Sequence, residues 1–225
     1  MSDRDAGIDP DGDDGSDAEA APAVGPALRA GVALFNEGFH LAAHEPWEAA
    51  WLPLEEGDDE RLLHGVIQFA AATHHARTGN DSGAVGTAEG ALGYLDGLGA
   101  RHRGIALDPI REWCRSIAAD PAAAADAVPP TLRIGDEPLG FDDLGLAATL
   151  AAIPAVAEAT GIGDEETMEM AGVFTREERG TGRSRFAELA VAYLREPDAR
   201  PQIAARIADH VDRKRRRRDD VDGLF

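Results

Sequence analysis

The stretch of residues 35–51, F-N-E-G-F-H-L-A-A-H-E-P-W-E-A-A-W, constrains the fold most, because apolar and titratable side chains share one helical face in it. Each residue of a helix turns by about 100°, so four side chains form one stripe: His40, His44, Glu48 and Trp51. A carboxylate beside an indole is buried only when it is paired or hydrogen-bonded. The stripe therefore predicts either a buried polar network or the wall of a pocket.

The segments on either side of this stretch predict an antiparallel arrangement of helices. Leu28, Val32 and Phe35 are spaced i, i+4, i+7 and indicate a helix over residues 26–37 that ends at Gly38. The polar break 55–59 is short enough to join the motif helix to an antiparallel helix over residues 60–78. Folding about Gly57 then pairs positions across the two helices: Trp51 with His64, Glu48 with Gln68, and His40 with His75.

The remaining sequence predicts an all-α helical bundle with one small β-hairpin. Helices are expected over 82–95, 108–119 and 184–195, with Ser184 as an N-cap, and around Ile203, Ile207 and Val211. A hairpin near 131–141 would turn at Gly135-Asp136. The expected division is a disordered acidic tail over 1–25, a helical core domain over 26–120, a linker over 121–130, and a mostly helical C-terminal region over 131–225.

Composition limits the class of protein further. The chain has 42 acidic and 22 basic side chains, and Lys214 is its only lysine. This balance is typical of a salt-loving organism, in which salt screens the repulsion of an acidic surface, so it does not indicate a cationic substrate. Cys114 stands alone and excludes an intramolecular disulfide. No apolar run approaches the ~20 residues of a membrane span, and we expect a soluble, cytoplasmic protein.

Four side chains of the expected hairpin are candidates for one site: His44, Glu48, Gln68 and His75. A divalent metal held by His44, Glu48 and His75 is chemically reasonable, because imidazole and carboxylate suit zinc, iron or manganese. In that hypothesis Glu48 is the base or a ligand, and His44 is a ligand or proton carrier. The other candidates would line the site for a ligand: Gln68, Trp51 and Glu45.

Two other interpretations of the same residues stay open. The polar groups could hydrogen-bond one another and set the register of the hairpin, with no chemistry attached. They could also bind a small ligand without a metal. In the first case the chain would be a non-enzymatic helical interaction module, and the sequence alone specifies neither a substrate, a protein partner nor an oligomeric state.

The motifs resemble those of a known family. His44-Glu45-Pro46-Trp47-Glu48 with Trp51, followed by Gly65-Val66-Ile67-Gln68, Ala70, Ala71, His75 and Gly79-Asn80, resembles the domain-of-unknown-function family 309. That family has the pattern H-E-x-x-E-x-x-W followed by G-L-I-Q-x-A-A-A, a later His and Gly-Asn. The resemblance covers about residues 30–95 and implies an all-helical fold, for which a metal-dependent hydrolase activity has been suggested. His40 stands where the family usually has an aromatic residue.

Near the C-terminus, residues 213–218 form the basic run R-K-R-R-R-R. Such a run can meet nucleic acid or another polyanion. In a chain this acidic we expect its partners to be the N-terminal segment or the carboxylates of the fold instead, and we do not expect nucleic acid. Val221, Leu224 and Phe225 are expected to hold the terminus against the core.

Overall fold

Helix-forming sequence dominates the chain, which the computed structural model describes over residues 23–178 and 184–222. These residues form an all-α fold with a minor antiparallel sheet, as the sequence predicted. The α-helices are α1 Val24–Asn36, α2 His44–Trp51, α3 Asp58–Arg77, α4 Asp81–Leu95, α5 Asp108–Ala119, α6 Pro121–Asp126, α7 Leu146–Thr160, α8 Glu165–Glu177, α9 Arg185–Arg195 and α10 Arg200–Asp222. The strands are β1 Arg101–His102, β2 Ile105–Ala106, β3 Arg133–Ile134 and β4 Glu137–Pro138, and the 3-10 helices are η1 Phe141–Asp143 and η2 Pro197–Ala199.

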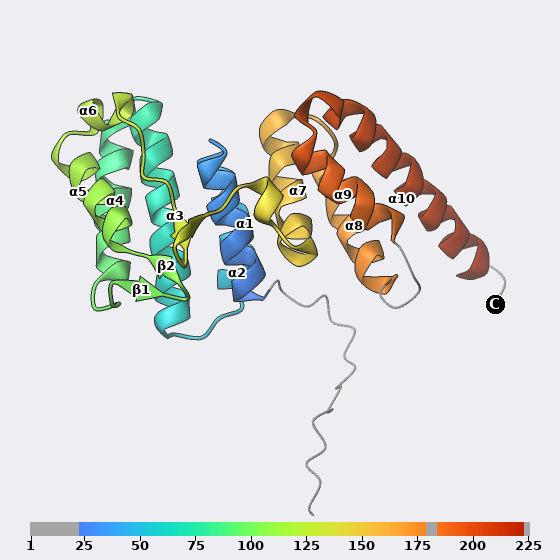
Figure 1. The fold of residues 1–225 in the computed structure, drawn as a ribbon, viewed down its shortest axis with the longest axis horizontal. Helices are drawn as coiled ribbons and strands as arrows, with labels where there is room; N and C mark the ends of the chain where they lie inside the picture. Colours follow the sequence, from blue (N-terminus) through green and yellow to red (C-terminus); the bar gives the residue numbers. More distant parts are fainter. Residues whose placement is uncertain (1–22, 179–183, 223–225) are drawn as a thin grey trace, which may run out of the picture.

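The helices lie side by side in an elongated row (Figure 1). α1 occupies the middle of the row and packs against both α2 and α7. α3 to α6 extend the row on one side, and α8 to α10 extend it on the other. Leu28, Val32 and Phe35 are buried in the core, so the predicted apolar stripe is the one that α1 uses.

α2 is shorter than the sequence suggested, and this corrects the predicted stripe. The helix begins at His44, so His40 lies in the turn before it and does not share its face. The reason is Pro46, which falls in the first turn of α2, where a missing N–H removes no helical hydrogen bond. Gly38, two residues after the end of α1, has a positive φ of 89°.

Two close helix contacts depend on glycine. A Cβ at Gly31 of α1 would lie 2.2 Å from the indole of Trp47, so the missing side chain lets α2 pack directly on α1. A Cβ at Gly65 of α3 would lie 2.6 Å from the side chain of Leu95, which has the same consequence for α3 and α4. α4 is capped by the Asn80 side chain, which accepts from the Gly83 N–H, so the helix begins at Asp81, one position before the range expected from the sequence.

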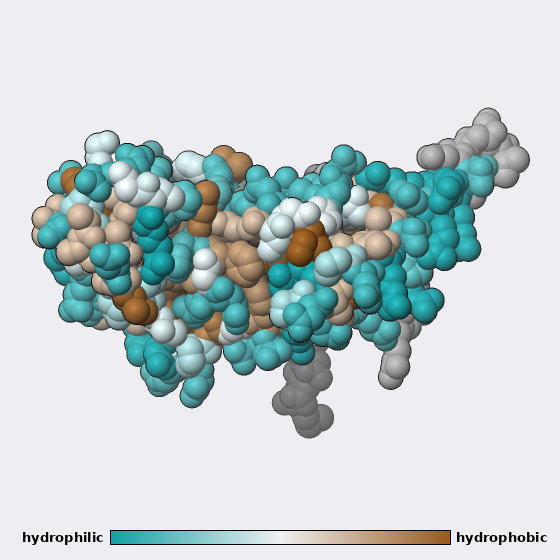
Figure 2. Space-filling model, turned by 90° about the horizontal axis from the view of Figure 1, so that it is seen from above, coloured by the Kyte–Doolittle hydropathy of each residue, from teal (hydrophilic) through white to brown (hydrophobic). Residues whose placement is uncertain are grey.

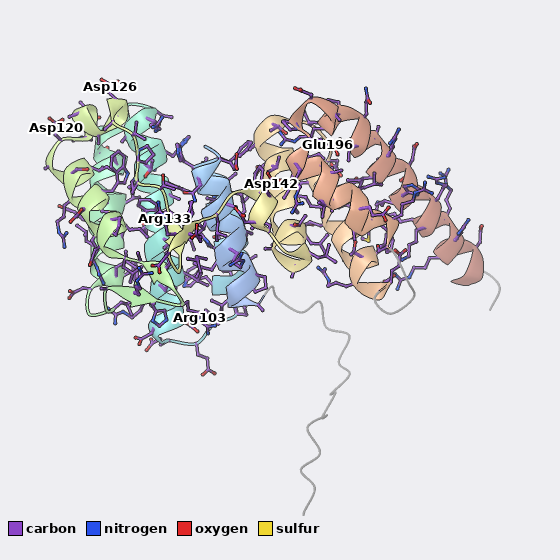
Figure 3. The ribbon with its side chains drawn as sticks, viewed as in Figure 1. Arg103, Asp120, Asp126, Arg133, Asp142 and Glu196 are labelled. Carbon is purple, nitrogen blue, oxygen red and sulfur yellow. The ribbon has the colours of Figure 1, made fainter. Side chains whose placement is uncertain are left out.

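The small sheet joins two hairpins in the order β1-β2-β3-β4. The hairpin β3–β4 turns at Gly135 as predicted, with Arg133 paired to Pro138. The hairpin β1–β2 was not expected; Arg103 and Gly104 both have positive φ at its two-residue turn, as a type I′ turn requires. Figure 3 labels Arg103 and Arg133 on the two hairpins.

Long-range hydrogen bonds attach the connecting segments to the helices. The Asn36 side chain, at the end of α1, donates to the carbonyls of Leu132 and Leu139 and accepts from the Leu132 N–H. Arg195 of α9 pairs with Asp142 of η1 at 3.4 Å, and Figure 3 labels Asp142. Residues 121–130, expected to be a linker, include the helix α6, which packs on α3.

The C-terminal helices follow the predicted patterns closely. Ser184 caps α9 by accepting from the Ala187 N–H, and Ile203, Ile207 and Val211 of α10 are buried. Within the described part of the chain, every helix is too short or too polar to cross a membrane. Residues 1–22 of the expected acidic tail, and the side chains of Val221, Leu224 and Phe225, lie outside the described residues. The division into two domains stays a prediction.

The surface is more hydrophilic at one end of the row than in its middle. Seen from above, hydrophilic residues cover the end formed by α8 to α10, while apolar residues reach the surface in the middle of this face (Figure 2).

Candidate functional site

The side chains that meet between α2, α3 and α4 are aromatic rings with one carboxylate. The indole N–H of Trp51 donates to Glu60 Oε1 at 2.8 Å. The rings of Trp51 and His64 lie 4.5 Å apart between centroids, which confirms the predicted pairing across the turn at Gly57. On its other side His64 stacks on Tyr94 of α4, with centroids 3.7 Å apart. One imidazole therefore links three helices.

His64 is held more by ring packing than by hydrogen bonds. Its Nδ1 atom is buried and lies 3.5 Å from Glu60 Oε1, but it makes no hydrogen bond in the structure. The side chains of His64 and Glu60 are each 20% exposed. Sequence reasoning placed His64 next to Trp51 but gave it no role, and it missed Glu60 and Tyr94 because neither belongs to the motif.

The two residues expected to carry catalysis lie at the surface of α2. His44 Nε2 and Glu48 Oε2 are 3.8 Å apart, and the two side chains are 30% and 47% exposed. His44 Nδ1 contacts the Leu41 carbonyl oxygen, which can only accept, so this nitrogen carries the proton. The other ring nitrogen, Nε2, faces Glu48.

The other expected ligands point elsewhere. The Gln68 side chain packs against Gly90 of α4, and no hydrogen bond or ion pair joins it to Glu48 in the described structure. His75 lies near the end of α3, where its Nδ1 accepts from the Asn80 side chain at 3.2 Å. Across residues 23–178 and 184–222, no three His, Cys, Asp or Glu side chains gather in a group that could hold a metal ion. The expected set of His44, Glu48 and His75 is not assembled into one site.

His40 is held in a way that keeps its ring neutral. Its ring packs on Phe35, with centroids 4.7 Å apart. Burial, together with the nearby charges of Arg77 and His74, lowers the pKa of His40 to about 4. The sequence predicted that His40 pairs with His75 near the end of α3, whereas the charges that act on its pKa there belong to Arg77 and His74 of the same helix.

The matched region of the chain coincides with these helices. Residues 28–87 match the family model DUF309, described as a domain of unknown function. The matched segment, called the DUF309 segment below, contains most of α1, all of α2 and α3, and the first half of α4. It includes every residue predicted for the site and leaves out Tyr94, the sheet and α7 to α10. A search of curated proteins found no match to this chain.

One residue of the DUF309 segment connects it to the C-terminal helices. Glu45 of α2 faces α7, where its carboxyl shares a hydrogen bond with Glu158. Burial, that hydrogen bond and the negative charges of Glu158, Glu165 and Glu169 raise the pKa of Glu45 to about 8. Glu45 therefore does not face the candidate ligands of α3. No local pattern could indicate Glu158, which is more than a hundred residues away.

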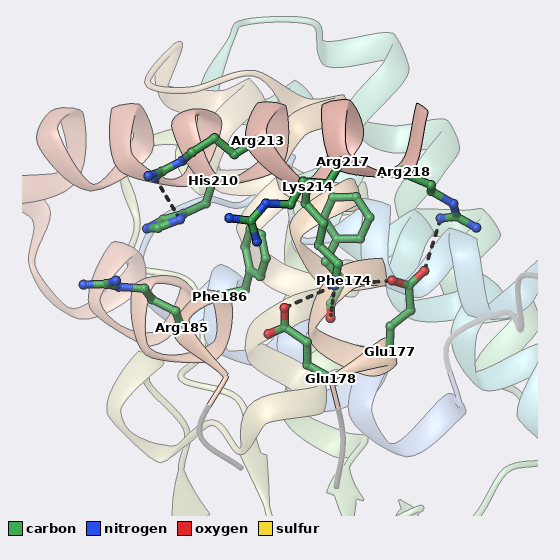
Figure 4. A pocket seen from close by; sticks show the side chains of 10 residues that line it. All are labelled: Phe174, Glu177, Glu178, Arg185, Phe186, His210, Arg213, Lys214, Arg217 and Arg218. Atoms are coloured by element: carbon green, nitrogen blue, oxygen red, sulfur yellow. Dashed lines mark hydrogen bonds and ion pairs between the residues drawn. The ribbon is translucent and has the colours of Figure 1, made fainter. Parts of the chain in front are cut away.

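Outside the DUF309 segment, a groove of about 770 Å³ lies between α8, α9 and α10 (Figure 4). Part of the basic run binds the carboxylates of α8 along it. Lys214 lies 3.3 Å from Glu177 and 3.1 Å from Glu178, and Arg218 lies 3.4 Å from Glu177. Arg215 binds Glu166 at 2.8 Å. These pairs confirm the prediction that carboxylates of the fold accompany the basic run.

Proposed function

We propose that the DUF309 segment is a non-enzymatic helical interaction module in which the two tryptophans of the H-E-P-W-E-A-A-W motif hold the helices together. The observation that carries this proposal is the contact set of Trp51, Glu60, His64 and Tyr94, because it uses Trp51 of the motif for packing between α2, α3 and α4. Ring stacking and a hydrogen-bonded indole stabilise a helix interface without any bound ion.

Trp47 supports the same conclusion on the other side of α2. Its side chain is fully buried, and its indole N–H donates to the Leu28 carbonyl at 3.3 Å. Gly31 leaves the space that this ring fills. The two tryptophans of the H-E-P-W-E-A-A-W motif thus attach α2 to α1 through Trp47 and to α3 through Trp51.

A surface for a protein partner is suggested by two exposed leucines at the ends of α2. Leu41, just before the helix, is 43% exposed, and Leu52, just after it, is 68% exposed. Among the described residues, Val128 is the only other large hydrophobic residue that is similarly exposed. Exposed apolar side chains at both ends of one helix can bury against another protein.

A metal-dependent hydrolase is the second candidate, and the His44–Glu48 pair is the observation that favours it. The side chains of His44 and Glu48 are both partly exposed to solvent, and imidazole and carboxylate are both types of metal ligand. They supply two ligands, and a third would have to come from water, substrate or a rearranged side chain.

Elemental analysis of protein purified without a histidine tag separates the two candidates. We expect no stoichiometric metal, and we expect His44→Ala and Glu48→Ala to change Tm little because both side chains reach solvent. Trp51→Phe removes the donor to Glu60 and should lower stability by about 1–3 kcal/mol, a fall of several degrees in Tm. Stoichiometric metal that is lost in both alanine variants would support the hydrolase instead.

The interaction surface has its own test. Leu52→Glu should leave Tm unchanged, because the side chain is largely exposed. Proteins that co-purify with the wild-type chain, when it is isolated from the cells that naturally make it, should not co-purify with Leu52→Glu. Glu48→Gln, on the same helix, is the control and should retain them. If the same proteins co-purify with Leu52→Glu and with wild type, a binding role for this surface is contradicted.

A further inference from the structure

The groove between α8, α9 and α10 has an unusual charge for this chain. Five cationic and two carboxylate side chains line it, a surplus of three positive charges in a chain of net charge −20. The floor consists of Phe174 and Phe186, which are 1% and 5% exposed. A positive surface over a buried aromatic floor concentrates anions locally, even where the overall charge repels them.

The two ends of the groove differ in how their cations are paired (Figure 4). At one end, Lys214 and Arg218 bind Glu177 and Glu178, and the Lys214 ammonium also lies 4.5 Å from the centre of the Phe174 ring. These contacts neutralise that end and hold Lys214 in place, so it offers little to a further ligand.

At the other end, Arg185, His210 and Arg213 lie together (Figure 4). Among the side chains that the structure describes, neither Arg185 nor Arg213 forms an ion pair with Asp or Glu. Arg213 Nη2 donates to His210 Nδ1 at 3.0 Å. His210 must then carry its own proton on Nε2, which leaves a further N–H donor at this end.

The protonation of His210 agrees with this arrangement. Burial, followed by the charges of Arg213 and Arg185, lowers the pKa of His210. The ring is therefore neutral near pH 7, accepts from Arg213 and keeps one N–H available. Asp209 and Glu178 act in the opposite direction on the same ring, but more weakly.

We propose that Arg185, Arg213 and the Nε2–H of His210 bind the phosphate group of a small phosphate-bearing molecule. Guanidinium groups match phosphate oxygens bidentately, and the imidazole adds a neutral donor. The site lies outside the DUF309 segment and does not depend on the function proposed for it.

The size and the surroundings of the groove favour a small ligand over a nucleic acid. A volume of about 770 Å³ lies within the range of small-molecule and cofactor sites. An extended polyanion would have to cross the surface of a chain with net charge −20, which opposes its binding. A compact phosphate compound needs only the three donors at the open end of the groove.

Calorimetric titration of the full chain with inorganic pyrophosphate tests the proposal, with inorganic phosphate as a second probe. We expect saturable binding of one pyrophosphate per chain in about 0.2 M KCl, and weaker binding in about 2 M KCl because of screening. Arg213→Gln and Arg185→Gln should each weaken binding about tenfold, because each removes charge-assisted hydrogen bonds.

Arg216→Gln is the matched control. Arg216 belongs to the same helix and carries the same charge, but it does not line the groove, and its Nε donates to the Asp212 carbonyl. We expect its affinity to stay within about twofold of wild type. Arg185 is exposed at the start of α9, so Arg185→Gln tests the site even if Arg213→Gln lowers stability.

Three outcomes would overturn the proposal. One is a wild-type chain that shows no saturable heat with either probe. Another is an equal loss of affinity in Arg216→Gln and Arg213→Gln, which would mean that the probe responds only to total charge. The last is single-stranded RNA that binds more tightly than pyrophosphate and is weakened equally by all three variants, which would identify a general polyanion surface.

Discussion

At the scale of single residues, Glu45 differs most from its expected role. Its backbone belongs to the H-E-P-W-E motif, but its carboxyl faces Glu158 of α7. Two carboxyl groups that share a hydrogen bond must share a proton, because the bond needs a donor and both ionised groups only accept. Burial adds to this effect, and Glu45 stays protonated to about pH 8. The motif thus contributes, through Glu45, to the contact between α2 and α7.

Glu45→Gln should change how stability depends on pH. The pKa of Glu45 is about 8 in the folded chain against 4.5 for the free group, so the folded state binds more protons than the unfolded state between these values. Wild-type stability should therefore fall as pH rises from about 4.5 to about 8. Glutamine can donate to Glu158 without ionising, and Tm at about pH 8.5 should rise by roughly 2–4 °C.

Thermal unfolding at about pH 5 and about pH 8.5 measures this effect. Glu48→Gln is the control, because Glu48 is on the same helix and its side chain is 47% exposed. The prediction is wrong if Glu45→Gln and Glu48→Gln have the same difference in Tm between the two pH values.

At the scale of elements, the order of the helices is set by close packing at small residues. α1 and α2 meet where Gly31 faces the Trp47 ring, and α3 and α4 meet where Gly65 faces Leu95. Thr73 of α3 is buried and accepts from the Trp113 indole N–H at 2.9 Å, which attaches α5 to the same helix. The last two contacts join α3 to α4 and to α5.

Gly31→Ala should destabilise the protein strongly. Its Cβ would lie 2.2 Å from the Trp47 indole and 2.7 Å from the Ala43 carbonyl oxygen, and neither can move freely inside the core. We expect a loss of about 3 kcal/mol in the free energy of unfolding, measured by urea denaturation. Gly86→Ala in α4 is the control, because its Cβ would meet open space, and it should stabilise the helix by up to about 1 kcal/mol. A smaller loss for Gly31→Ala than 1 kcal/mol would show that α2 can shift without cost.

At the scale of the whole molecule, an elongated row of helices carries a formal charge of −20 (Figure 1). A row exposes more surface than a sphere, and its carboxylates repel one another across that surface. Surface ion pairs such as Arg215–Glu166 offset little of this repulsion, since exposed pairs contribute only about 0–1 kcal/mol.

The charge predicts that salt stabilises the folded chain. Raising KCl from about 0.1 M to about 1 M shortens the screening length from about 10 Å to about 3 Å, so Tm should rise at pH 7. The rise should shrink near pH 4, where many carboxylates are neutral and the net charge is smaller. Thermal unfolding across KCl concentrations at both pH values measures this. A Tm that falls with KCl, or rises equally at both pH values, would contradict the explanation.

Much of the fold was predictable because it depends on local sequence. The helical periodicity of Leu28, Val32 and Phe35, the cap at Ser184 and the turn at Gly135 act within a few residues, so their elements form where expected. The approach of Trp51 to His64 was also predictable, because a short break at Gly57 allows only an antiparallel return.

The candidate site was predictable only in part, because the arrangement of its side chains depends on which neighbour each side chain meets. Helical spacing gave a shared stripe, but it could not show that Gln68 faces α4, that His75 binds Asn80 or that Glu45 faces Glu158. The start of α2, the hairpin β1–β2 and the groove beside α10 likewise required the folded chain. Sequence by itself determined most of the helices and one turn, since their energies are local. Tertiary packing decided the partners of the polar groups, since these come from segments far apart in the chain.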